Sequence, residues 1–332
     1  MFAKLISTLK KSPKTIVFTE GTDPRILEAS ARLLSGNFLK PVLVGNPDEI
    51  AAAAEDIGFN IRGAEIIDPE NYDGMDEMVD KMVELRKGKM TADECRAALK
   101  KSNYFGTMLV KMGIADCLLG GATYSTADTV RPALQLVKTK KGAHLVSSCF
   151  IMIRGDETLA MGDCAINIDY QDNVDKEGNV TFTAAQKLAE VAVATAETAK
   201  VFGVDPKVAM LSYSTKGSGK GANVDLVRNA TEEAKKLAPE LKLDGEMQFD
   251  AAVSPVVGQL KFPGSPVAGY ANTFIFPEIQ SGNIGYKIAQ RLGGFAAYGP
   301  ILQGLNAPIN DLSRGCNAEE VYQMSIITAA LK

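Results

Sequence analysis

The sequence predicts an α/β protein of two domains, and three of its features support this. Stretches typical of buried strands alternate with stretches typical of amphipathic helices from the first residues onward. The chain has 332 residues, which is enough for two ordinary domains with full cores. Near residue 144 the alternation is interrupted by two consecutive strand patterns, so we expect a domain boundary there.

The first part of the chain consists of repeated strand–helix units. "TIVFTE" is typical of a buried strand, and "DPRILEASARLL" is typical of a helix capped by Asp23 with Pro24 in its first turn. "KPVLVGN" and "NPDEIAAAAEDIG" repeat this pattern with Asn46 at the cap. "AEIID", the helix in "DGMDEMVDKMVELRKGK", a Thr91/Glu94 capping box and the strand "DCLLGG" continue it. This alternation predicts a mainly parallel sheet with helices on both faces.

The second part begins with a different pattern. "HLVSSCFIMIRGDETLAMGDCAIN" predicts an antiparallel hairpin that turns at Gly155 and Asp156. A helix with a Thr183/Gln186 capping box, the strand "KVAMLSYS" and the helix "NVDLVRNATEEAKKLA" then restore the alternation. The chain has no flexible linker rich in Pro, Gly or Ser and no internal repeat, so we expect two closely packed domains with a cleft between them.

Composition excludes several classes of protein. With 46% hydrophobic and 23% charged residues, a net charge of -4 and a pI near 5.3, the chain has no general basic field for nucleic acid or a membrane. It has neither a signal peptide pattern nor a transmembrane run, so we expect a cytoplasmic protein. The five cysteines are scattered without a CxxC, which predicts free thiols and no structural metal.

The chain has one histidine, His144, at the head of the apolar run "HLVSSCFIMI". A Ser–His–Asp or Cys–His hydrolase would need this residue as its base, which argues against both classes. We interpret His144 instead as a partly buried strand residue.

The stretch "NDLSRGCNAEE", residues 310–320, places Ser313, Arg314 and Cys316 around one glycine. Asn317 and Glu320 have the spacing of a capping box for the following helix. A cap does not require the other side chains, whereas an arginine beside a hydroxyl and a glycine is suited to hold an oxyanion. An ordinary turn remains the alternative at this point.

A second loop, "SYSTKGSGKGAN", joins a strand to a helix at residues 212–223 and contains three glycines and two lysines. Its backbone N–H groups could point at a phosphate, assisted by the helix dipole. The spacing matches neither a Walker A loop nor the dinucleotide fingerprint, so ATP and NAD are not indicated. An anion cradle and a flexible turn both remain open.

Four arginines stand in settings other than a simple helix surface: Arg86, Arg131, Arg291 and Arg314. Each one alone could be a solvated side chain or a charge near a helix C-terminus. Together they would suit a polyanionic ligand.

Several of these stretches together resemble the phosphate acetyltransferase family, whose members interconvert acetyl phosphate and coenzyme A with acetyl-CoA and phosphate. The motifs are "FTEGTDPRILEAS", "STADTVRPALQ", "LSYSTKGS", "GEMQFDAA", "SGNIGYKIAQR", "GPILQGL" and "NDLSRGC". They span nearly the whole chain in the order and spacing of the family, and the length is similar to that of the class without extra N-terminal domains.

The resemblance implies a two-domain α/β fold similar to that of the isocitrate and isopropylmalate dehydrogenases, with the site in the interdomain cleft. It implies that residues 1–143 and 300–332 form the first domain and residues 144–299 the second. It also implies a homodimer that acts on coenzyme A, acetyl phosphate and phosphate, with no permanently bound cofactor and no metal.

The resemblance further implies residue roles. Arg86 and Arg131 match arginines associated with coenzyme A, Arg291 and Arg314 match those at the reacting phosphate, and Ser313 lies beside them. Glu320 stands where the family usually has an aspartate proposed as the base. The "LSYSTKGS" motif assigns Ser214, Thr215, Lys216 and Gly217 to binding of the substrate or coenzyme A.

Three alternatives remain beside this function. Phosphate butyryltransferase has the same fold and mechanism but a larger acyl pocket. A noncatalytic sensor of coenzyme A or acyl phosphate would be expected to lack the four arginines, which are all present. A dehydrogenase of related fold is disfavoured because the sequence has no metal-binding aspartate set and no nicotinamide motif.

Overall fold

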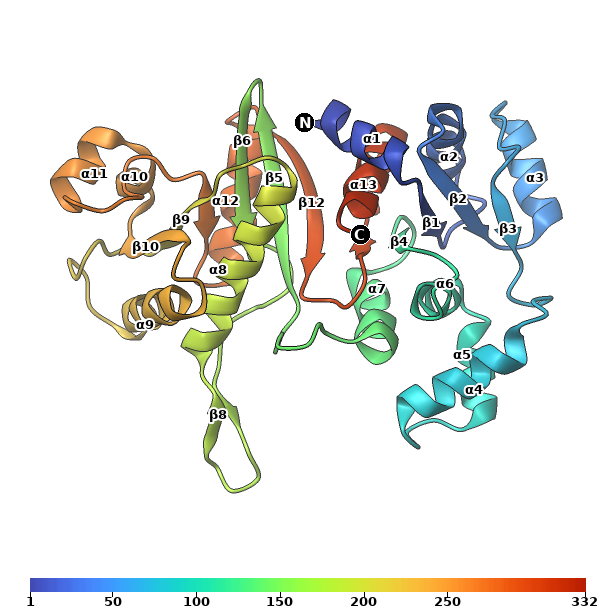
Figure 1. Ribbon diagram of the computed structural model, residues 1–332, viewed down its shortest axis with the longest axis horizontal. Coiled ribbons are helices and arrows are strands. Elements are labelled where there is room, and N and C mark those ends of the chain that lie inside the picture. Colours follow the sequence, from blue (N-terminus) through green and yellow to red (C-terminus); the bar gives the residue numbers. More distant parts are fainter. The chain divides into compact units, whose positions relative to one another are not determined.

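A computed structural model describes residues 1–332. The chain forms two compact units, of which unit 1 comprises Met1–Lys141 and Leu305–Lys332 and unit 2 comprises Gly142–Gly304. Both termini therefore belong to unit 1, where the red C-terminal helix lies against blue N-terminal elements (Figure 1). None of the helices has the length and apolarity that a membrane span requires.

Unit 1 contains a five-stranded sheet in the order β13-β4-β1-β2-β3, and every neighbouring pair is parallel. The predicted parallel sheet is thus confirmed, and its last strand comes from the C-terminal segment. The strands are β1 (Lys14–Phe18), β2 (Leu39–Val44), β3 (Glu65–Ile67), β4 (Cys117–Gly120) and β13 (Ile309–Asp311).

Side-chain caps start most of the predicted helices of unit 1. The Asp23 carboxylate accepts a hydrogen bond from the Arg25 amide and Asn46 accepts from two amides, each with proline at the first helical position. Both capping boxes, Thr91/Glu94 and Asn317/Glu320, are formed. The helices are α1 (Phe2–Lys11), α2 (Pro24–Gly36), α3 (Pro47–Asp56), α4 (Met75–Arg86), α5 (Ala92–Leu99), α6 (Ser102–Lys111), α7 (Thr126–Pro132), the π-helix Ala133–Val137 and α13 (Ala318–Ala330).

In unit 1, the side of the sheet to which the chain adds new strands changes between β1 and β4, although all the strands remain parallel. From β1 the chain adds β2 and β3 on one side, whereas from β4 it adds β13 on the other. In open parallel sheets, ligands bind outside the carboxyl ends of the strands at such a switch point. The loops after β1, β4 and β13 meet at this edge.

Unit 2 contains a six-stranded mixed sheet in the order β10-β9-β11-β6-β5-β12. The predicted hairpin is confirmed, since β5 and β6 are antiparallel and turn at Gly155, which has a φ of +59°. The sheet strands are β5 (Ser147–Arg154), β6 (Glu157–Gly162), β9 (Lys207–Leu211), β10 (Lys242–Met247), β11 (Thr273–Ile275) and β12 (Ala296–Gln303).

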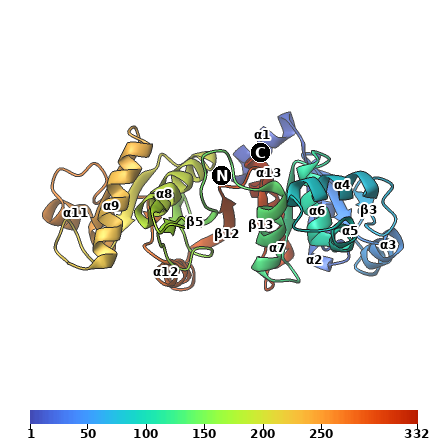
Figure 2. The same ribbon diagram turned by 90° about the horizontal axis from the view of Figure 1, so that it is seen from below.

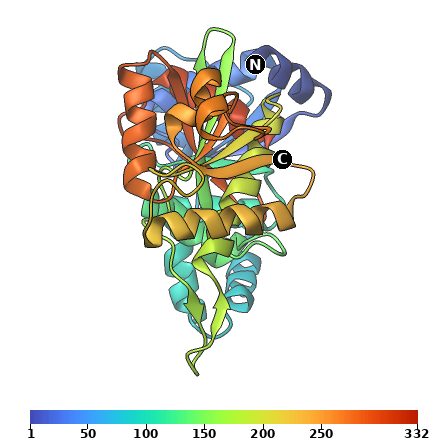
Figure 3. The same cartoon turned by 90° about the vertical axis from the view of Figure 1, so that its left-hand side faces the viewer.

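Alternating side chains of the unit 2 strands pack into two cores on opposite faces of the sheet. In β9, Ala209 and Leu211 belong to one core, while Val208 and Met210 belong to the other. Helices α8 (Ala184–Val201), α9 (Ala222–Leu237), α10 (Phe249–Val253), α11 (Pro255–Lys261) and α12 (Ile279–Arg291) complete the unit. A small hairpin, β7 (Asn173–Val174) and β8 (Val180–Phe182), projects beyond the start of α8 (Figure 3).

Among the differences from the sequence interpretation are helix α6 and the setting of His144. Helix α6 was not predicted, because residues 105–110 are buried on every side and show no amphipathic period. His144 is not a partly buried strand residue, since it precedes β5 and is exposed. Its backbone amide donates to Glu190 at 3.0 Å, and its ring pairs with the same carboxylate and stacks on Phe182.

Candidate functional site

A partly buried carboxylate joins two of the loops at the switch point of unit 1. Glu20 follows β1, and its Oε1 accepts hydrogen bonds from the amides of Gly121 at 3.0 Å and Thr123 at 3.2 Å in the loop after β4. The Thr19 hydroxyl bridges Glu20 Oε2 and the Tyr124 hydroxyl, with both distances 2.8 Å. Burial raises the pKa of Glu20, although these donors act in the opposite direction.

Asp311, at the end of β13, fixes helix α7 to the same edge. Its buried carboxylate accepts from the hydroxyls of Thr126 and Thr129, both at 2.6 Å, and Figure 2 shows α7 beside β13. Burial raises the pKa of this carboxyl. Gly121 packs against it with a φ of +98°, and a Cβ there would overlap the carboxylate. The threonines of "STADT" are therefore structural.

The loop of residues 312–317 continues from β13 along this edge. It starts with the Leu312 amide, which donates to the Gly120 carbonyl at 2.7 Å. Ser313 is exposed, and its hydroxyl oxygen accepts from the Gly315 amide at 3.2 Å. Arg314 is also exposed, and its guanidinium makes no hydrogen bond or ion pair with the protein. Two polar side chains are thus presented to solvent on a loop with a defined backbone.

The predicted capping box closes the end of this loop. Asn317 Oδ1 accepts from the Glu320 amide at 2.9 Å, and Glu320 Oε2 accepts from the Asn317 amide at 2.9 Å. Glu320 is partly exposed in the first turn of α13. The cap uses one carboxylate oxygen of Glu320 and leaves the other without a hydrogen bond from the protein. The role of Glu320 as a base remains a prediction.

The four candidate arginines differ from most other arginines of the chain. None of their guanidinium groups makes an ion pair or hydrogen bond, a property that only Arg62 shares. The arginines that pair with carboxylates are Arg25, Arg32, Arg96, Arg154 and Arg228.

Three of the four candidates nevertheless lie in the last turn of a helix, where a cation is favourable for the dipole. They are Arg86 in α4, Arg131 in α7 and Arg291 in α12. Arg131 and Arg291 are exposed, while Arg86 has its Nε buried without a partner. Burying a guanidinium N–H without an acceptor is costly.

The backbone amides of the glycine-rich loop of unit 2 are hydrogen-bonded within the protein. Every amide from residue 215 to residue 219 donates to an acceptor within the loop or to Glu246 of β10. The Glu246 carboxylate accepts from the Gly217 amide at 2.7 Å and from the buried Ser214 hydroxyl at 2.9 Å. Thr215 is also buried, whereas Lys216 is exposed with its Nζ 5.0 Å from the Phe262 ring centre.

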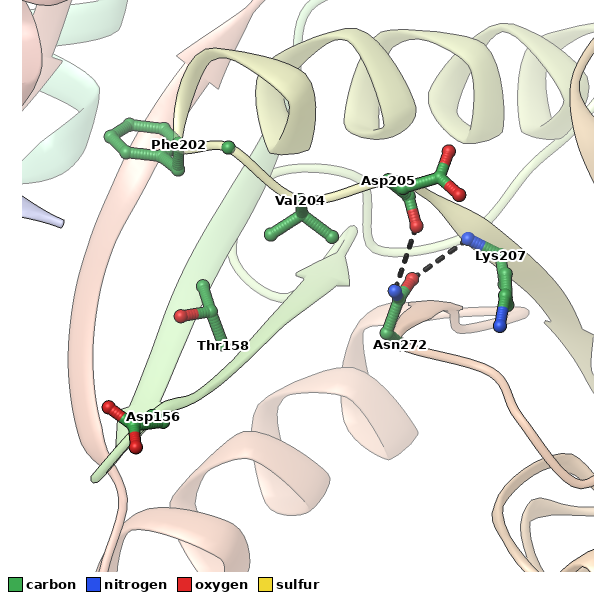
Figure 4. Close-up of a pocket in the computed structure, with 8 residues that line it drawn as sticks. Asp156, Thr158, Phe202, Val204, Asp205, Lys207 and Asn272 are labelled. Atoms are coloured by element: carbon green, nitrogen blue, oxygen red, sulfur yellow. Dashed lines mark hydrogen bonds between the residues drawn. The ribbon is translucent and has the colours of Figure 1, made fainter.

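Two of the cavities in the structure contain no candidate residue. One of about 300 Å³ lies in unit 2 near the amino ends of β6 and β9, where Asn272 binds the Asp205 carbonyl and the Lys207 amide (Figure 4). The other, of about 510 Å³, lies beside β3 in unit 1 and has four acidic residues but no basic one. An anionic ligand is not expected in the acidic cavity.

The sequence did not identify Glu20, Arg25 or Asp311, which organise the loops at the edge of the unit 1 sheet. Glu20 could have been found from its position just after a predicted parallel strand, because such positions lie at the ligand-binding edge. No local signal identifies the other two.

Comparison with known proteins gives consistent results. Residues 1–329 match the family described as phosphate acetyl/butaryl transferase. A phosphate acetyltransferase of Bacillus subtilis is 54% identical over 315 residues, covering 95% of this chain and 94% of the relative. One of Staphylococcus epidermidis is 49% identical over 337 residues, covering 99% and 98%.

Solved structures show the same fold. A phosphotransacetylase from Streptococcus pyogenes has a TM-score of 0.92 and 52% identity, with 99% of this chain and 98% of that chain covered. A branched-chain phosphotransacylase from Enterococcus faecalis has a TM-score of 0.67 at 19% identity, covering 96% and 98%. At that identity the second similarity supports the fold alone.

Proposed function

Because the chain belongs to the phosphate acetyl/butaryl transferase family, we propose roles for its residues in the reaction of that family. The protein is an acyltransferase that interconverts acetyl phosphate and coenzyme A with acetyl-CoA and phosphate. The observation that carries the proposal is the exposed, unpaired Arg314 beside Ser313, on a loop whose backbone is fixed.

Arg314 binds the phosphate of acetyl phosphate in this proposal. Its planar guanidinium matches two phosphate oxygens, and no protein carboxylate competes for it. The resemblance assigns Arg291, which is also unpaired, to the same phosphate. Two cations offset the repulsion between a phosphate and an approaching thiolate, and they stabilise the leaving group as its charge develops.

The reaction is a direct transfer of the acetyl group. The coenzyme A sulfur attacks the carbonyl carbon, an S–C bond forms, and the C–O bond to phosphate breaks with its electron pair leaving on phosphate. The Ser313 hydroxyl donates to the carbonyl oxygen as negative charge develops there. Glu320 takes the thiol proton through the carboxylate oxygen that the cap does not use.

Cys316 does not carry the acetyl group in this mechanism. Its side chain is buried, with 7% of the residue exposed. Burial raises the pKa of its thiol, although the nearby Arg25 acts in the opposite direction, so the thiol stays protonated near neutral pH. A protonated thiol is a poor nucleophile, and coenzyme A already supplies one.

Isotope exchange tests this mechanism. The protein is incubated with acetyl phosphate and labelled inorganic phosphate in the absence of coenzyme A. Direct transfer predicts no label in acetyl phosphate, with exchange only after coenzyme A is added. Exchange without coenzyme A would require a covalent acetyl-enzyme and would refute the proposal.

Coenzyme A is bound by Arg86 and Arg131 in this proposal. The buried Nε of Arg86, which has no acceptor in the protein, supports its assignment to a phosphate of the ligand. In the 214–217 segment, the exposed Lys216 makes the contact, while Ser214 and Thr215 shape the loop from inside. The relatives named phosphate acetyltransferase support acetyl phosphate rather than butyryl phosphate as the substrate of this chain, and turnover of acyl phosphates of increasing chain length tests this assignment.

We also propose that the protein is a cytoplasmic homodimer. The dimer is supported by an exposed apolar stripe along α12 and its C-cap, where Ile284, Ile288 and the C-cap residue Leu292 follow one another at four-residue intervals. All five cysteines are free thiols, which fits a reducing compartment. Sedimentation of the intact protein tests the dimer, and an Ile288→Glu variant is expected to sediment as a monomer.

A further inference from the structure

Arg25 binds the backbone of the loop that carries Ser313 and Arg314. Its Nη1 donates to the carbonyl oxygen of Arg314 at 2.9 Å and to that of Cys316 at 3.1 Å. The same nitrogen lies 3.6 Å from the Cys316 sulfur. Arg25 lies just after the start of α2, so it holds this loop from inside unit 1.

The other nitrogens of Arg25 are fixed by two further loops. Nε and Nη2 bind both oxygens of Asp23 at 2.9 Å and 2.7 Å, and Nη2 also donates to the Ala122 carbonyl at 3.0 Å. Asp23 is itself held in place, because it caps α2 by accepting from the Arg25 amide at 2.9 Å. One guanidinium therefore joins the loops after β1, β4 and β13.

The chemistry of this cluster requires an arginine. Five acceptor atoms surround a single planar group with five N–H donors. A lysine at this position would keep the charge but has three donors on one nitrogen, so it cannot bind a carboxylate bidentately and three carbonyls together.

A neighbouring arginine on the same helix has no such function. Arg32, also in α2, pairs with Glu319 and lies 4.1 Å above the Tyr322 ring, with both partners in or beside the first turns of α13. It also links α2 to α13, but it contacts no backbone carbonyl of the 312–317 loop. Arg25 and Arg32 are therefore a matched pair, and they differ in whether they hold the loop.

From these contacts we propose that Arg25 is a positioning residue, which fixes the Ser313–Arg314 loop through its carbonyls and touches no substrate. This inference rests on the proposed roles of Ser313 and Arg314. Without the guanidinium, the carbonyls of residues 314 and 316 lose their donor and the loop can adopt other conformations. A displacement of about 1 Å at a group that stabilises the transition state is sufficient for a large loss of rate.

The test compares Arg25→Ala, Arg25→Lys and Arg32→Ala in the intact protein, measuring kcat and the KM for coenzyme A. We expect both Arg25 variants to lose about 30- to 100-fold in kcat with the KM for coenzyme A within about threefold of wild type. Arg32→Ala should stay within about twofold in both constants. Added guanidinium ion should restore a large part of the kcat of Arg25→Ala, because it can occupy the vacated position.

Alkylation of Cys316 provides a second readout that does not depend on turnover. The buried thiol of the wild type should react slowly, and Arg25→Ala should accelerate its alkylation at least about tenfold because the loop opens. Arg32→Ala should leave the alkylation rate unchanged. Turnover of Arg25→Ala within about threefold of wild type would overturn the inference. Loss of turnover with neither guanidinium rescue nor faster alkylation would overturn it as well.

An Arg314→Ala variant in the same assay distinguishes this inference from the proposed function. If Arg314→Ala is fully active, the role of Arg314 is wrong, whatever Arg25 does. If Arg314→Ala is impaired while Arg25→Ala is not, the proposed function stands and the positioning role fails alone.

Discussion

The two loops that the sequence indicated as anion sites are held by groups of opposite charge. In unit 1, the cation Arg25 holds the 312–317 loop through its carbonyls. In unit 2, the anion Glu246 holds the 214–219 loop through its hydroxyl and amide donors. Both loops follow parallel strands and contain glycine and a basic residue, so their sequences look alike.

This difference determines what each loop can bind. A loop held by its carbonyls keeps its side chains available for an anion. The amides of residues 215–219 instead all donate within the protein, that of Gly217 to the Glu246 carboxylate, so this loop has no N–H groups left for phosphate. Glu246 in effect occupies the position that a bound anion would take in a phosphate-binding loop. A glycine-rich loop after a strand is therefore evidence of an anion site built from backbone N–H groups only when those groups are free.

The largest expected effect is that of Arg314→Ala, which removes the cation of the first loop. We expect kcat to fall by at least about a hundredfold, because a charge-assisted contact that strengthens in the transition state contributes about 2–4 kcal/mol. Arg62→Ala is the matched control, since Arg62 is also exposed and unpaired in unit 1. Retention of more than about a third of wild-type kcat by Arg314→Ala would show that this loop does not carry the reaction.

Glu320→Gln tests the far end of the same loop. The glutamine oxygen can still accept from the Asn317 amide and preserve the capping box, but it cannot take a proton. We expect kcat to fall about a hundredfold, and Glu320→Asp to retain much of the activity. If Glu320→Gln turns over like wild type from about pH 6 to pH 9, the residue is a helix cap only.

Glu246→Gln removes the anion beneath the second loop and should affect stability rather than turnover. Burial alone would raise the pKa of Glu246, but the Gly217 amide, the Ser214 hydroxyl and Arg228 outweigh it, and the pKa is lowered from 4.5. The ionised Glu246 carboxylate therefore stabilises the folded state above its unfolded-state pKa, and this stabilisation is lost as pH falls through its lower folded-state pKa. We expect a loss of about 1–3 kcal/mol near neutral pH that shrinks in acid, with kcat within about threefold of wild type.

Glu20→Gln gives the opposite pH trend and is the control for this effect. The pKa of Glu20 is raised by burial, so its contribution to stability is present below the unfolded-state pKa and is lost as pH rises through the folded-state pKa. The thermal stability of Glu20→Gln relative to wild type should therefore improve as pH rises. Parallel trends for the two variants would contradict the assignment of opposite pKa shifts to these carboxylates.

The smallest effect is expected for Lys216→Met, which removes the exposed side chain of the second loop that we propose contacts coenzyme A. The KM for coenzyme A should rise about three- to fivefold with kcat unchanged, as for a solvent-screened charge contact. Lys216→Arg should restore the wild-type KM. A tenfold or larger loss in kcat would mean that the second loop takes part in the reaction itself.

Local chemistry explains what could be predicted from the sequence. Asp23, Asn46 and Asn317 cap helices through partners two or three residues away, and the hairpin at Gly155 is equally local. Helix α6 escaped prediction because its burial removes the amphipathic signal. In the site, Ser313 and Arg314 were indicated by their residue types, but the contact that fixes them joins positions 289 residues apart. No local pattern specifies such a pairing.

The most direct measurement is a titration of the intact ¹⁵N-labelled protein with inorganic phosphate, following the backbone amide resonances of both loops. We predict saturable shifts at Ser313, Arg314 and Gly315, with the amides of residues 215–219 unchanged. In Arg314→Ala the shifts in the first loop should disappear. Saturable shifts at Gly217 and Gly219 without any at Arg314 would contradict the account, because phosphate would then bind the loop whose amides Glu246 and its neighbours already occupy.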